Sequence, residues 1–227
     1  MNKTVTVPFM LLGILFSVCL IASNLLSTKV LKIGDFTTIS GGMLVFPISY
    51  IVNDCIVEVW GYKKTRMVIW IGFAANFFVF SLAQLVAFWP SPDFWDGESS
   101  FNFIFGLAPR IALASVSAFL VGSFLNAYVM SKLKIYHKGK YFSFRAIAST
   151  LVGETADSAI FFPIAFAGIV APKDLFSMSV TETLLKSSYE VVVLPITIAL
   201  VKYLKRAENT DIYDHNISYN LLKVRDI

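Results

Sequence analysis

Four carboxylates lie within stretches of this chain that are otherwise apolar and long enough to cross a membrane. Asp54 and Glu58 occupy one stretch, and Glu154 and Asp157 occupy another. An acidic side chain at the centre of a membrane-spanning helix costs roughly 2.5 to 3.5 kcal/mol on insertion scales. Charges retained at that cost usually mark a transport pathway or a binding site, so these residues are candidates for contact with a polar substrate.

The helical repeat places these carboxylates on polar faces. With 3.6 residues per turn, Glu154 and Asp157 share one helix face, and Asp54 and Glu58 share a face of another helix. Further polar or aromatic residues extend these faces or mark two other helices: Thr150, Ser158 and Phe161; Gly13, Ser17, Asn24 and Thr28; and Ser187, Ser188 and Glu190. Polar faces on three or four helices predict an enclosed polar cavity near the centre of a helix bundle.

A competing interpretation is that small and polar residues serve only helix packing, because they let helices approach closely and form hydrogen bonds across the interface. It applies best to Gly13, Ser17 and a face formed by Ala112, Ser115, Gly122 and Asn126. Neutral groups could make the same contacts without a charge, so the carboxylates favour a functional role. Arg110 and Arg145 begin predicted helices, and an alternative for each is that it extends to a membrane interface.

Composition indicates which elements must position these residues. The 227-residue chain is 56% hydrophobic and only 15% charged, and its mean hydropathy is +0.70. A soluble domain has about a quarter of its residues charged, so this is an integral membrane protein. A spanning helix needs about 20 apolar residues, and the sequence predicts six spans, at about 8–28, 40–60, 67–89, 107–131, 145–170 and 183–203.

We therefore predict an all-α membrane protein with one six-helix domain, residues 1–205, and a polar, flexible cytoplasmic tail, residues 206–227. Basic residues in short loops favour the cytoplasmic side. They gather in the second loop, the fourth loop and the end of the last helix, whereas the third loop is acidic. Both termini are thus expected in the cytoplasm, although Lys29 and Lys32 on the outer side disagree. The basic patches indicate topology and not nucleic-acid binding.

Two segments depart from a simple helical pattern. Residues 37–42 carry β-branched residues and two glycines, and Pro47 and Asn53-Asp54 interrupt the apolar run that follows. Irregular backbone at membrane depth is tolerated only inside protein or beside a water-filled cavity, so this segment is expected to face the interior. After Trp89-Pro90, an aromatic-rich loop through about Phe105 predicts an interfacial belt or a short lid on the outer surface.

Motifs for enzymatic chemistry are missing from the sequence. There is no GxSxG, HExxH or Walker motif, and His137 and His215 both lie outside the predicted spans. Cys19 and Cys55 lie inside spans and have no metal-binding spacing. The sequence predicts no enzyme and no cofactor. A small six-helix protein with a polar centre is most simply a transporter or a substrate-binding membrane subunit.

Several segments together resemble a known family. They are Ala22-Ser23-Asn24-Leu25-Leu26, Phe46-Pro47 followed by Asn53-Asp54, Arg110-Ile111-Ala112 with Ala114-Ser115, and Ala148-Ser149-Thr150-Leu151 with Gly153 and Asp157. In order and spacing, from about residue 10 to 205, the chain is similar to the vitamin uptake transporter family, better known as the queuosine precursor transporters. The resemblance implies import of 7-deazaguanine bases (preQ0, preQ1 or queuine) across the bacterial inner membrane. It also implies a fold similar to the substrate-binding subunits of energy-coupling-factor transporters.

The resemblance assigns substrate contact to residues at matching motif positions, namely Asn24, Asp54, Arg110, Ser149 and Asp157. Glu154, Glu58 and Glu190 rest on the residue pattern alone. A carboxylate accepts the N–H donors on the N1/N2 edge of a 7-deazaguanine in a bidentate geometry. The O6 atom requires a donor, for which the candidates are Asn24, Asn53, Ser149 and Arg145, and the ring could stack on Phe46, Tyr50 or Phe161.

Three hypotheses remain open from the sequence. The first is a stand-alone importer of deazapurines in the lipid bilayer. The second is a substrate-binding subunit of an ATP-driven importer, which requires separate energising subunits. The third is a membrane assembly factor whose polar faces bind a partner helix and no small molecule. A homo-oligomer is compatible with the first two.

Overall fold

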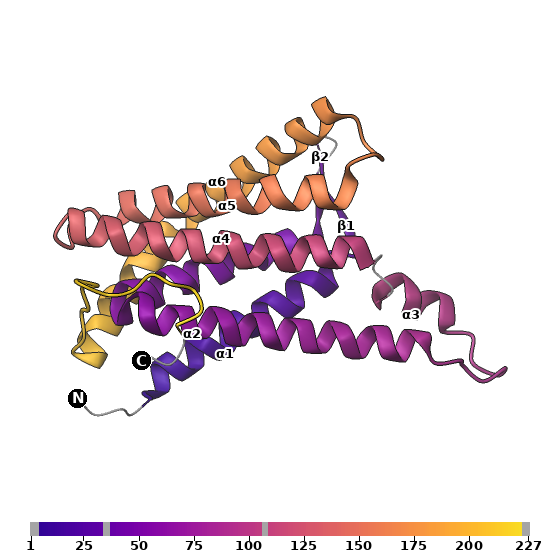
Figure 1. Ribbon diagram of the computed structural model, residues 1–227, viewed down its shortest axis with the longest axis horizontal. Coiled ribbons are helices and arrows are strands. Elements are labelled where there is room, and N and C mark those ends of the chain that lie inside the picture. Colours follow the sequence, from indigo (N-terminus) through magenta and orange to yellow (C-terminus); the bar gives the residue numbers. More distant parts are fainter. Residues whose placement is uncertain (1–4, 34–36, 106–108, 224–227) are drawn as a thin grey trace.

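The computed structural model describes residues 5–33, 37–105 and 109–223, which form an elongated bundle of helices (Figure 1). The helices are α1 (Val7–Leu26), α2 (Phe46–Phe88), α3 (Glu98–Phe105), α4 (Pro109–Tyr136), α5 (Phe142–Phe166) and α6 (Pro172–Glu208). Between α1 and α2 lie strands β1 (Val30–Ile33) and β2 (Thr37–Ser40) and a 3-10 turn, η1 (Gly41–Leu44). Positions 107 and 108 of the predicted fourth span, and the last four residues of the predicted tail, lie outside the described residues.

Four described segments are long and apolar enough to cross a membrane: Val7–Leu26, Gly41–Phe88, Leu113–Tyr136 and Pro172–Glu208. The expectation of an all-helical membrane protein is therefore confirmed. The predicted spans 40–60 and 67–89 both fall largely within the second of these segments. Helix α5, which carries Glu154 and Asp157, is not among the four, and the count of six crossings stays a prediction.

Helix α2 bends sharply at Gly61. This residue has φ 79° and ψ 172°, a conformation that glycine adopts readily because it lacks a Cβ atom. The arms on either side, 46–60 and 62–88, run in opposite directions along the bundle (Figure 1). A Cβ atom at Gly61 would lie 2.7 Å from Oδ1 of Asp214. The predicted basic loop between two spans is therefore a tight reversal, and Lys63, Lys64 and Arg66 already belong to the second arm.

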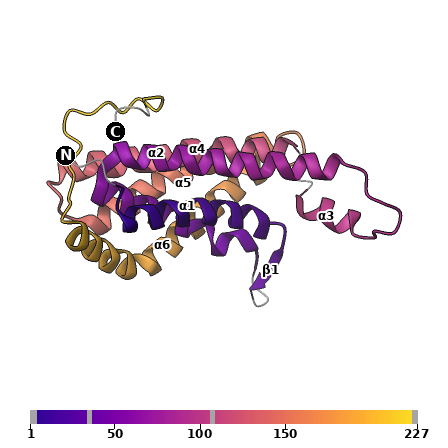
Figure 2. The same ribbon diagram turned by 90° about the horizontal axis from the view of Figure 1, so that it is seen from below.

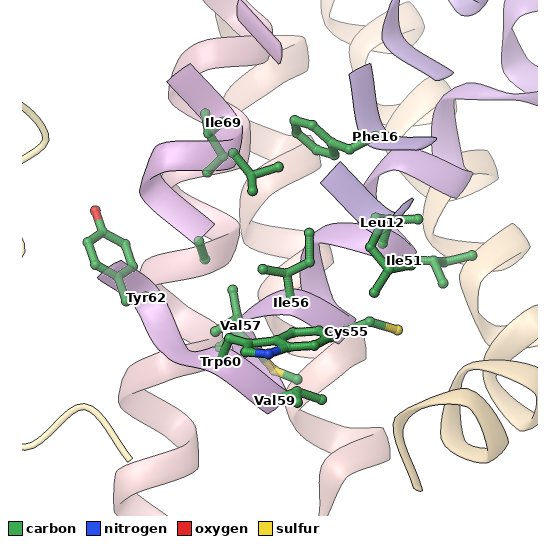
Figure 3. Packing of buried hydrophobic residues seen from close by; sticks show 14 of the residues in the cluster. Leu12, Phe16, Ile51, Cys55, Ile56, Val57, Val59, Trp60, Tyr62 and Ile69 are labelled. Atoms are coloured by element: carbon green, nitrogen blue, oxygen red, sulfur yellow. The ribbon is translucent and has the colours of Figure 1, made fainter. Parts of the chain in front are cut away.

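A hydrophobic core fills the half of the bundle nearest Gly61. It joins α1, the first arm of α2 and α4 (Figure 3), and it includes Phe16, Ile56 and Trp60. The rings of Phe9 and Trp60 meet edge to face, with their centroids 5.3 Å apart. This apolar packing fixes the first arm of α2 against α1, and so it positions the polar residues that this arm carries.

Close packing of α4 against α5 depends on two facing glycines. A Cβ atom at Gly122 would lie 2.9 Å from the main-chain oxygen of Gly153 and 2.6 Å from the hydroxyl of Tyr50. Only a residue without a side chain allows this approach. The contact brings Tyr50 of α2 beside Asp157 of α5, because a Cβ at Gly122 would also lie 3.0 Å from the Cβ of Asp157.

The segment predicted to be irregular, 37–42, is partly regular. Residues 37–40 form β2, which pairs antiparallel with β1, and Ser40 begins the η1 turn by accepting a hydrogen bond from the Gly42 N–H group. The β-branched residues that interrupted the helical pattern favour a strand. Figure 2 shows the hairpin projecting from the bundle and α3 at the end away from the start of α1. In the predicted aromatic loop, α3 is bound to α2 by a hydrogen bond from Gln84 to the Phe105 main-chain oxygen.

The segment after α6 differs from the expected flexible tail because it packs back on α2 and α4. The ring centroids of Tyr62 and Tyr219 lie 4.8 Å apart. Arg66 donates hydrogen bonds to the main-chain oxygens of Ser218 and Asn220. Many side chains of this segment are exposed, as the polar composition suggested, but its main-chain oxygens accept from the buried Arg66, and the buried Asp214 accepts from Ser131 and the Tyr62 N–H.

Candidate functional site

A cavity of about 650 Å³ opens among α1, η1, α2, α4, α5 and α6, near the β-hairpin. Its walls combine aromatic and small polar side chains with three charged ones. The lining includes Ser23, Asn24, Ser27, Ser40, Met43, Phe46, Ser115, Asp157, Phe161, Phe162, Phe166, Thr181, Glu182 and Lys186. Of the residues predicted to contact substrate, Asn24, Asp157 and the stacking candidates Phe46 and Phe161 line this cavity.

Lys186 of α6 lies at the centre of the charges around the cavity. Its Nζ atom is 2.8 Å from Glu182 Oε1, 3.1 Å from Glu154 Oε2 and 3.5 Å from Asp157 Oδ2. The ammonium group also lies 4.3 Å from the centroid of the Phe46 ring. An isolated buried charge is strongly unfavourable, so the lysine and the carboxylates stabilise one another. One cation thus faces three carboxylates beside the cavity.

Lys186 was not among the residues predicted for the site, and Glu154 was predicted from the residue pattern alone. Two signals were available: Lys186 lies inside the predicted span 183–203, and it follows Glu182 by one helical turn. Charged residues inside a span usually pair with one another. In the structure Glu154 is buried and reaches the cavity through Lys186.

Asn24 is oriented by two neighbours. Its Nδ2 atom donates to Oδ1 of Asn76 at 3.0 Å, and its Oδ1 atom accepts from the Ser115 hydroxyl at 3.3 Å. These contacts join α1, α2 and α4 at one point. An amide nitrogen has two N–H groups, so Asn24 retains one donor that a ligand in the cavity could use.

A second polar group lies deeper, behind the cavity. Asp54 of α2 and Glu190 of α6 have exposed fractions of 0% and 2%. Asn53 donates to Asn126 Oδ1 at 2.9 Å, and Asn126 donates to Thr150 Oγ1 at 3.2 Å. This chain of amides and hydroxyl crosses from α2 to α4 and α5. The predicted residues Asn53 and Asp54 therefore belong to the interior of the bundle and do not line the cavity.

Glu58 and Arg145 form a buried ion pair near Gly61, away from the cavity. Both guanidinium Nη atoms of Arg145 donate to the Glu58 carboxylate, and Lys205 Nζ lies 2.6 Å from Glu58 Oε1. Arg145 has an exposed fraction of 0%, so it does not extend to an interface. The structure brings these two predicted site residues together with each other and not with Asp157.

Asp211, just after α6, completes this ion cluster, with Lys134 Nζ and Lys205 Nζ at 2.6 and 2.9 Å from its Oδ1. Burial by itself would raise the pKa of Asp211, but the hydrogen bonds and charges of the two lysines outweigh it and lower that pKa below its usual value. In this cluster each carboxylate, Glu58 or Asp211, therefore has cations beside it.

The remaining predicted residues make main-chain contacts. Arg110 donates to the main-chain oxygens of Ile164 and Ala167, and so binds the end of α5. Ser149 is buried and donates to the Ala146 oxygen. Neither residue lines the cavity. In the part of the chain that the structure describes, no group of three or more His, Cys, Asp or Glu residues is arranged to hold a metal ion.

Comparisons with known proteins agree with the resemblance seen in the motifs. The family model described as "Putative vitamin uptake transporter" matches residues 40–200. The "Probable queuosine precursor transporter" of Bacillus subtilis is 25% identical over 191 residues, which cover 84% of this chain and 83% of that protein. The "Queuosine precursor transporter" of Escherichia coli is 29% identical over 158 residues, 67% of this chain and 66% of that protein.

A third relative, the "Probable queuosine precursor transporter" of Haemophilus influenzae, is 28% identical over 125 residues, 55% of this chain and 51% of that protein. No solved structure matches the chain. The family match covers all of α2, α4 and α5, most of α6, and therefore Asp54, Glu154 and Asp157. The family is one of transporters and not of enzymes, and this chain belongs to the putative vitamin uptake transporter family.

Proposed function

We propose that this protein imports queuosine precursors, 7-deazaguanine bases such as preQ0, preQ1 or queuine, across the bacterial inner membrane. The relatives whose names specify queuosine precursors support the class of substrate. The observation that carries the proposal is the cavity that joins a buried carboxylate, Asp157, to aromatic rings. Its volume of about 650 Å³ lies within the range usual for small-molecule sites.

The chemistry of the cavity wall fits a guanine-like base. The Asp157 carboxylate can accept the N1–H and exocyclic N–H groups together, a charge-assisted and bidentate contact. The free N–H of Asn24 can donate to O6 of the base. Phe46 and Phe161 offer ring faces for stacking. Ser149, Arg110, Glu58 and Arg145, which the sequence also suggested, do not line the cavity and have no place in this proposal.

The proposed membrane arrangement has six crossings, because the two arms of α2 and helix α5 each extend along the bundle (Figure 1). Helix α1 begins and α6 ends at the end of the bundle where α2 bends, and the connection between α4 and α5 lies at the same end (Figure 1). Lys63 and Lys64 follow the bend in the chain, and Lys138 and Lys140 belong to that connection. Basic residues favour the cytoplasmic side, so both termini are cytoplasmic and the cavity faces outward. The likeness to the substrate-binding subunits of energy-coupling-factor transporters belongs to this proposal and rests on the sequence resemblance.

Asp157→Asn tests the substrate assignment. The change replaces an acceptor oxygen with an amide that presents a donor to the N–H groups of the base. Mismatched buried polar groups cost roughly 1–3 kcal/mol, and more when a charge is involved, so preQ1 should bind at least about tenfold more weakly. Calorimetric titration of the purified protein measures this effect. Asp93→Asn, in the exposed turn after α2, is the matched control and should bind as the wild type does.

Adenine is the matched ligand control because it lacks the paired N–H donors, and a site built to bind those donors rejects it. Equal binding of preQ1 by the wild type and by Asp157→Asn, or equal competition by adenine, would overturn the assignment. Uptake by the purified protein alone in liposomes separates a stand-alone importer from a subunit that needs energising partners. An assembly factor would bind none of these bases.

A further inference from the structure

Asp54 and Glu190 form a polar site that the substrate cavity does not use. Asp54 lies on the first arm of α2, and Glu190 lies on α6 one helical turn beyond the cavity residue Lys186. Both side chains are almost fully buried. Among the described residues, neither carboxylate forms an ion pair, and no donor makes a well-formed hydrogen bond to any of their four oxygens.

The two carboxylates face each other within hydrogen-bonding range. The Asn126 amide of α4 lies against Asp54, and the Thr150 hydroxyl of α5 lies against Glu190. Glu58 also acts on Asp54, but the oxygens of Glu58 are occupied by Arg145 and Lys205. Among the described residues, no cation therefore compensates the pair from any of the helices packed around it.

Two carboxylates in such a position cannot both carry a charge. Like charges at short range repel strongly inside a protein, and burial penalises each charge further. A proton shared between the two groups removes this repulsion, because one oxygen then donates a hydrogen bond to the other. Known carboxylate pairs hold a shared proton for the same reason.

Tyr50 supplies an independent observation. Its hydroxyl has no hydrogen-bond partner among the described residues, although the residue is 2% exposed. The hydroxyl lies beside Asp157, because a Cβ atom at Gly122 would lie 2.6 Å from this hydroxyl and 3.0 Å from the Cβ of Asp157. Tyr50 also precedes Asp54 by one helical turn on the same arm of α2. A hydroxyl both donates and accepts a proton. It is therefore the group through which a proton can pass from the cavity to the pair.

We infer that Asp54 and Glu190 are a proton-binding site, and that a proton entering from the cavity drives the import of substrate. This inference rests on the proposed transport function. Charging and neutralising the pair changes the electrostatic energy of α6 against α2. Helix α6 also carries Lys186, which contacts Asp157 in the cavity. One helix therefore connects occupancy of the substrate site to occupancy of the proton site.

The test uses the purified wild-type protein in liposomes with labelled preQ1 outside. If one proton enters with each substrate, an inward gradient of about one pH unit should support roughly tenfold accumulation, since about one pH unit corresponds to roughly 1.36 kcal/mol. A protonophore should abolish the accumulation, and a dye in the lumen should report acidification that accompanies uptake. Accumulation driven by a sodium gradient, without acidification, would overturn the inference.

Glu190→Gln and Asp54→Asn remove one titratable group while preserving shape. Each variant should still exchange labelled for unlabelled preQ1 across the membrane, but gradient-driven accumulation should disappear. Glu208→Gln makes the same chemical change at the end of α6, and it should accumulate substrate as the wild type does. Accumulation at the wild-type level in both pair variants would overturn the inference. Failure of wild-type protein to bind or exchange preQ1 would instead contradict the proposed function itself.

Discussion

Glu58 and Asp54 lie one helical turn apart on the same arm of α2, but their surroundings differ in charge. Glu58 has cations beside it, and Asp54 has another carboxylate. Glu58 receives two hydrogen bonds from Arg145 and one from Lys205, and these cations in turn contact Asp211 or main-chain oxygens. Asp54 faces Glu190 and, among the described residues, has no cation beside it. Two carboxylates one helical turn apart therefore differ: Glu58 is neutralised by cations, and Asp54 has none among the described residues.

The contrast separates structural charges from functional ones. A buried ion pair with matched hydrogen bonds closes the end of the bundle near Gly61, where the segment after α6 packs back on α2 and α4. Near the cavity, three carboxylates share one lysine, and behind it, in the part of the chain that the structure describes, two carboxylates share none. Unpaired groups lower stability, and their retention inside a membrane bundle supports the proposed roles in binding substrate and protons.

The largest expected effect comes from breaking the satisfied region. Arg145→Met leaves the Glu58 carboxylate without its bidentate partner, and removing one member of a buried ion pair typically costs about 3–5 kcal/mol. Thermal unfolding of the purified protein in detergent should show a large fall in Tm. Arg110→Met is the control, because the exposed Arg110 donates, among the described residues, to the main-chain oxygens of Ile164 and Ala167 and to no carboxylate. Equal melting temperatures for Arg145→Met and wild type would place Glu58 among the functional carboxylates instead.

A smaller effect is expected where α4 meets α5 beside the cavity. In Gly122→Ala the new Cβ would lie 2.9 Å from the Gly153 oxygen, so the helices must separate, and overpacking of this kind typically costs about 1–3 kcal/mol. Both Tm and preQ1 affinity should fall, because the same contact places Tyr50 beside Asp157. The control is Gly13→Ala, whose Cβ would meet Val68 at an ordinary 3.7 Å. If preQ1 affinity is unchanged in Gly122→Ala, the contact between α4 and α5 does not determine the shape of the substrate cavity.

Asp54→Asn should have little effect on stability, in contrast to Glu58→Gln. Replacing Asp54 removes a carboxylate that has no cation beside it among the described residues. The free energy of unfolding should therefore fall by no more than about 1 kcal/mol, or should rise, and the Tm should change accordingly. Glu58→Gln, measured in parallel, strands Arg145 and should lower the Tm markedly. A marked fall in Asp54→Asn would show that this carboxylate has a structural partner and would remove the contrast between the two residues.

The smallest effect is expected at the surface of the ion cluster. Asp211 is 41% exposed, and exposed ion pairs contribute about 0–1 kcal/mol, so Asp211→Asn should lower stability only slightly. The lysines lower its pKa in the folded state, so its contribution is present above the unfolded value of 3.8 and is lost as the pH falls through the folded pKa. Denaturation at about pH 7 and in acid below the lowered folded pKa measures it. A difference between variant and wild type that persists in acid would contradict this assignment.

Much of the bundle was predictable because apolar length is a property of consecutive residues. The predicted spans overlap α1, both arms of α2, α4, α5 and α6. Asn24, Asp157 and Phe161 were predicted for the site and do line the cavity. The β-hairpin and the packing of the segment after α6 were not predicted. Both depend on backbone pairing or on contacts with distant helices. The β-branched residues and glycines of 37–42 suggested only irregular backbone, and the polar composition after residue 206 suggested only a flexible tail.

The sequence by itself determined that this chain is a membrane protein, which residues carry charge inside it, and the family to which it belongs. Only the tertiary structure decided which charges are satisfied. Glu58 pairs with Arg145, 87 residues away, and with Lys205, 147 residues away, whereas Asp54 meets Glu190. Asp54 and Glu58 cannot be told apart from the sequence, because their spacing of four residues shows only that they share a helix face. Whether that face meets a cation depends on how the other helices pack against it.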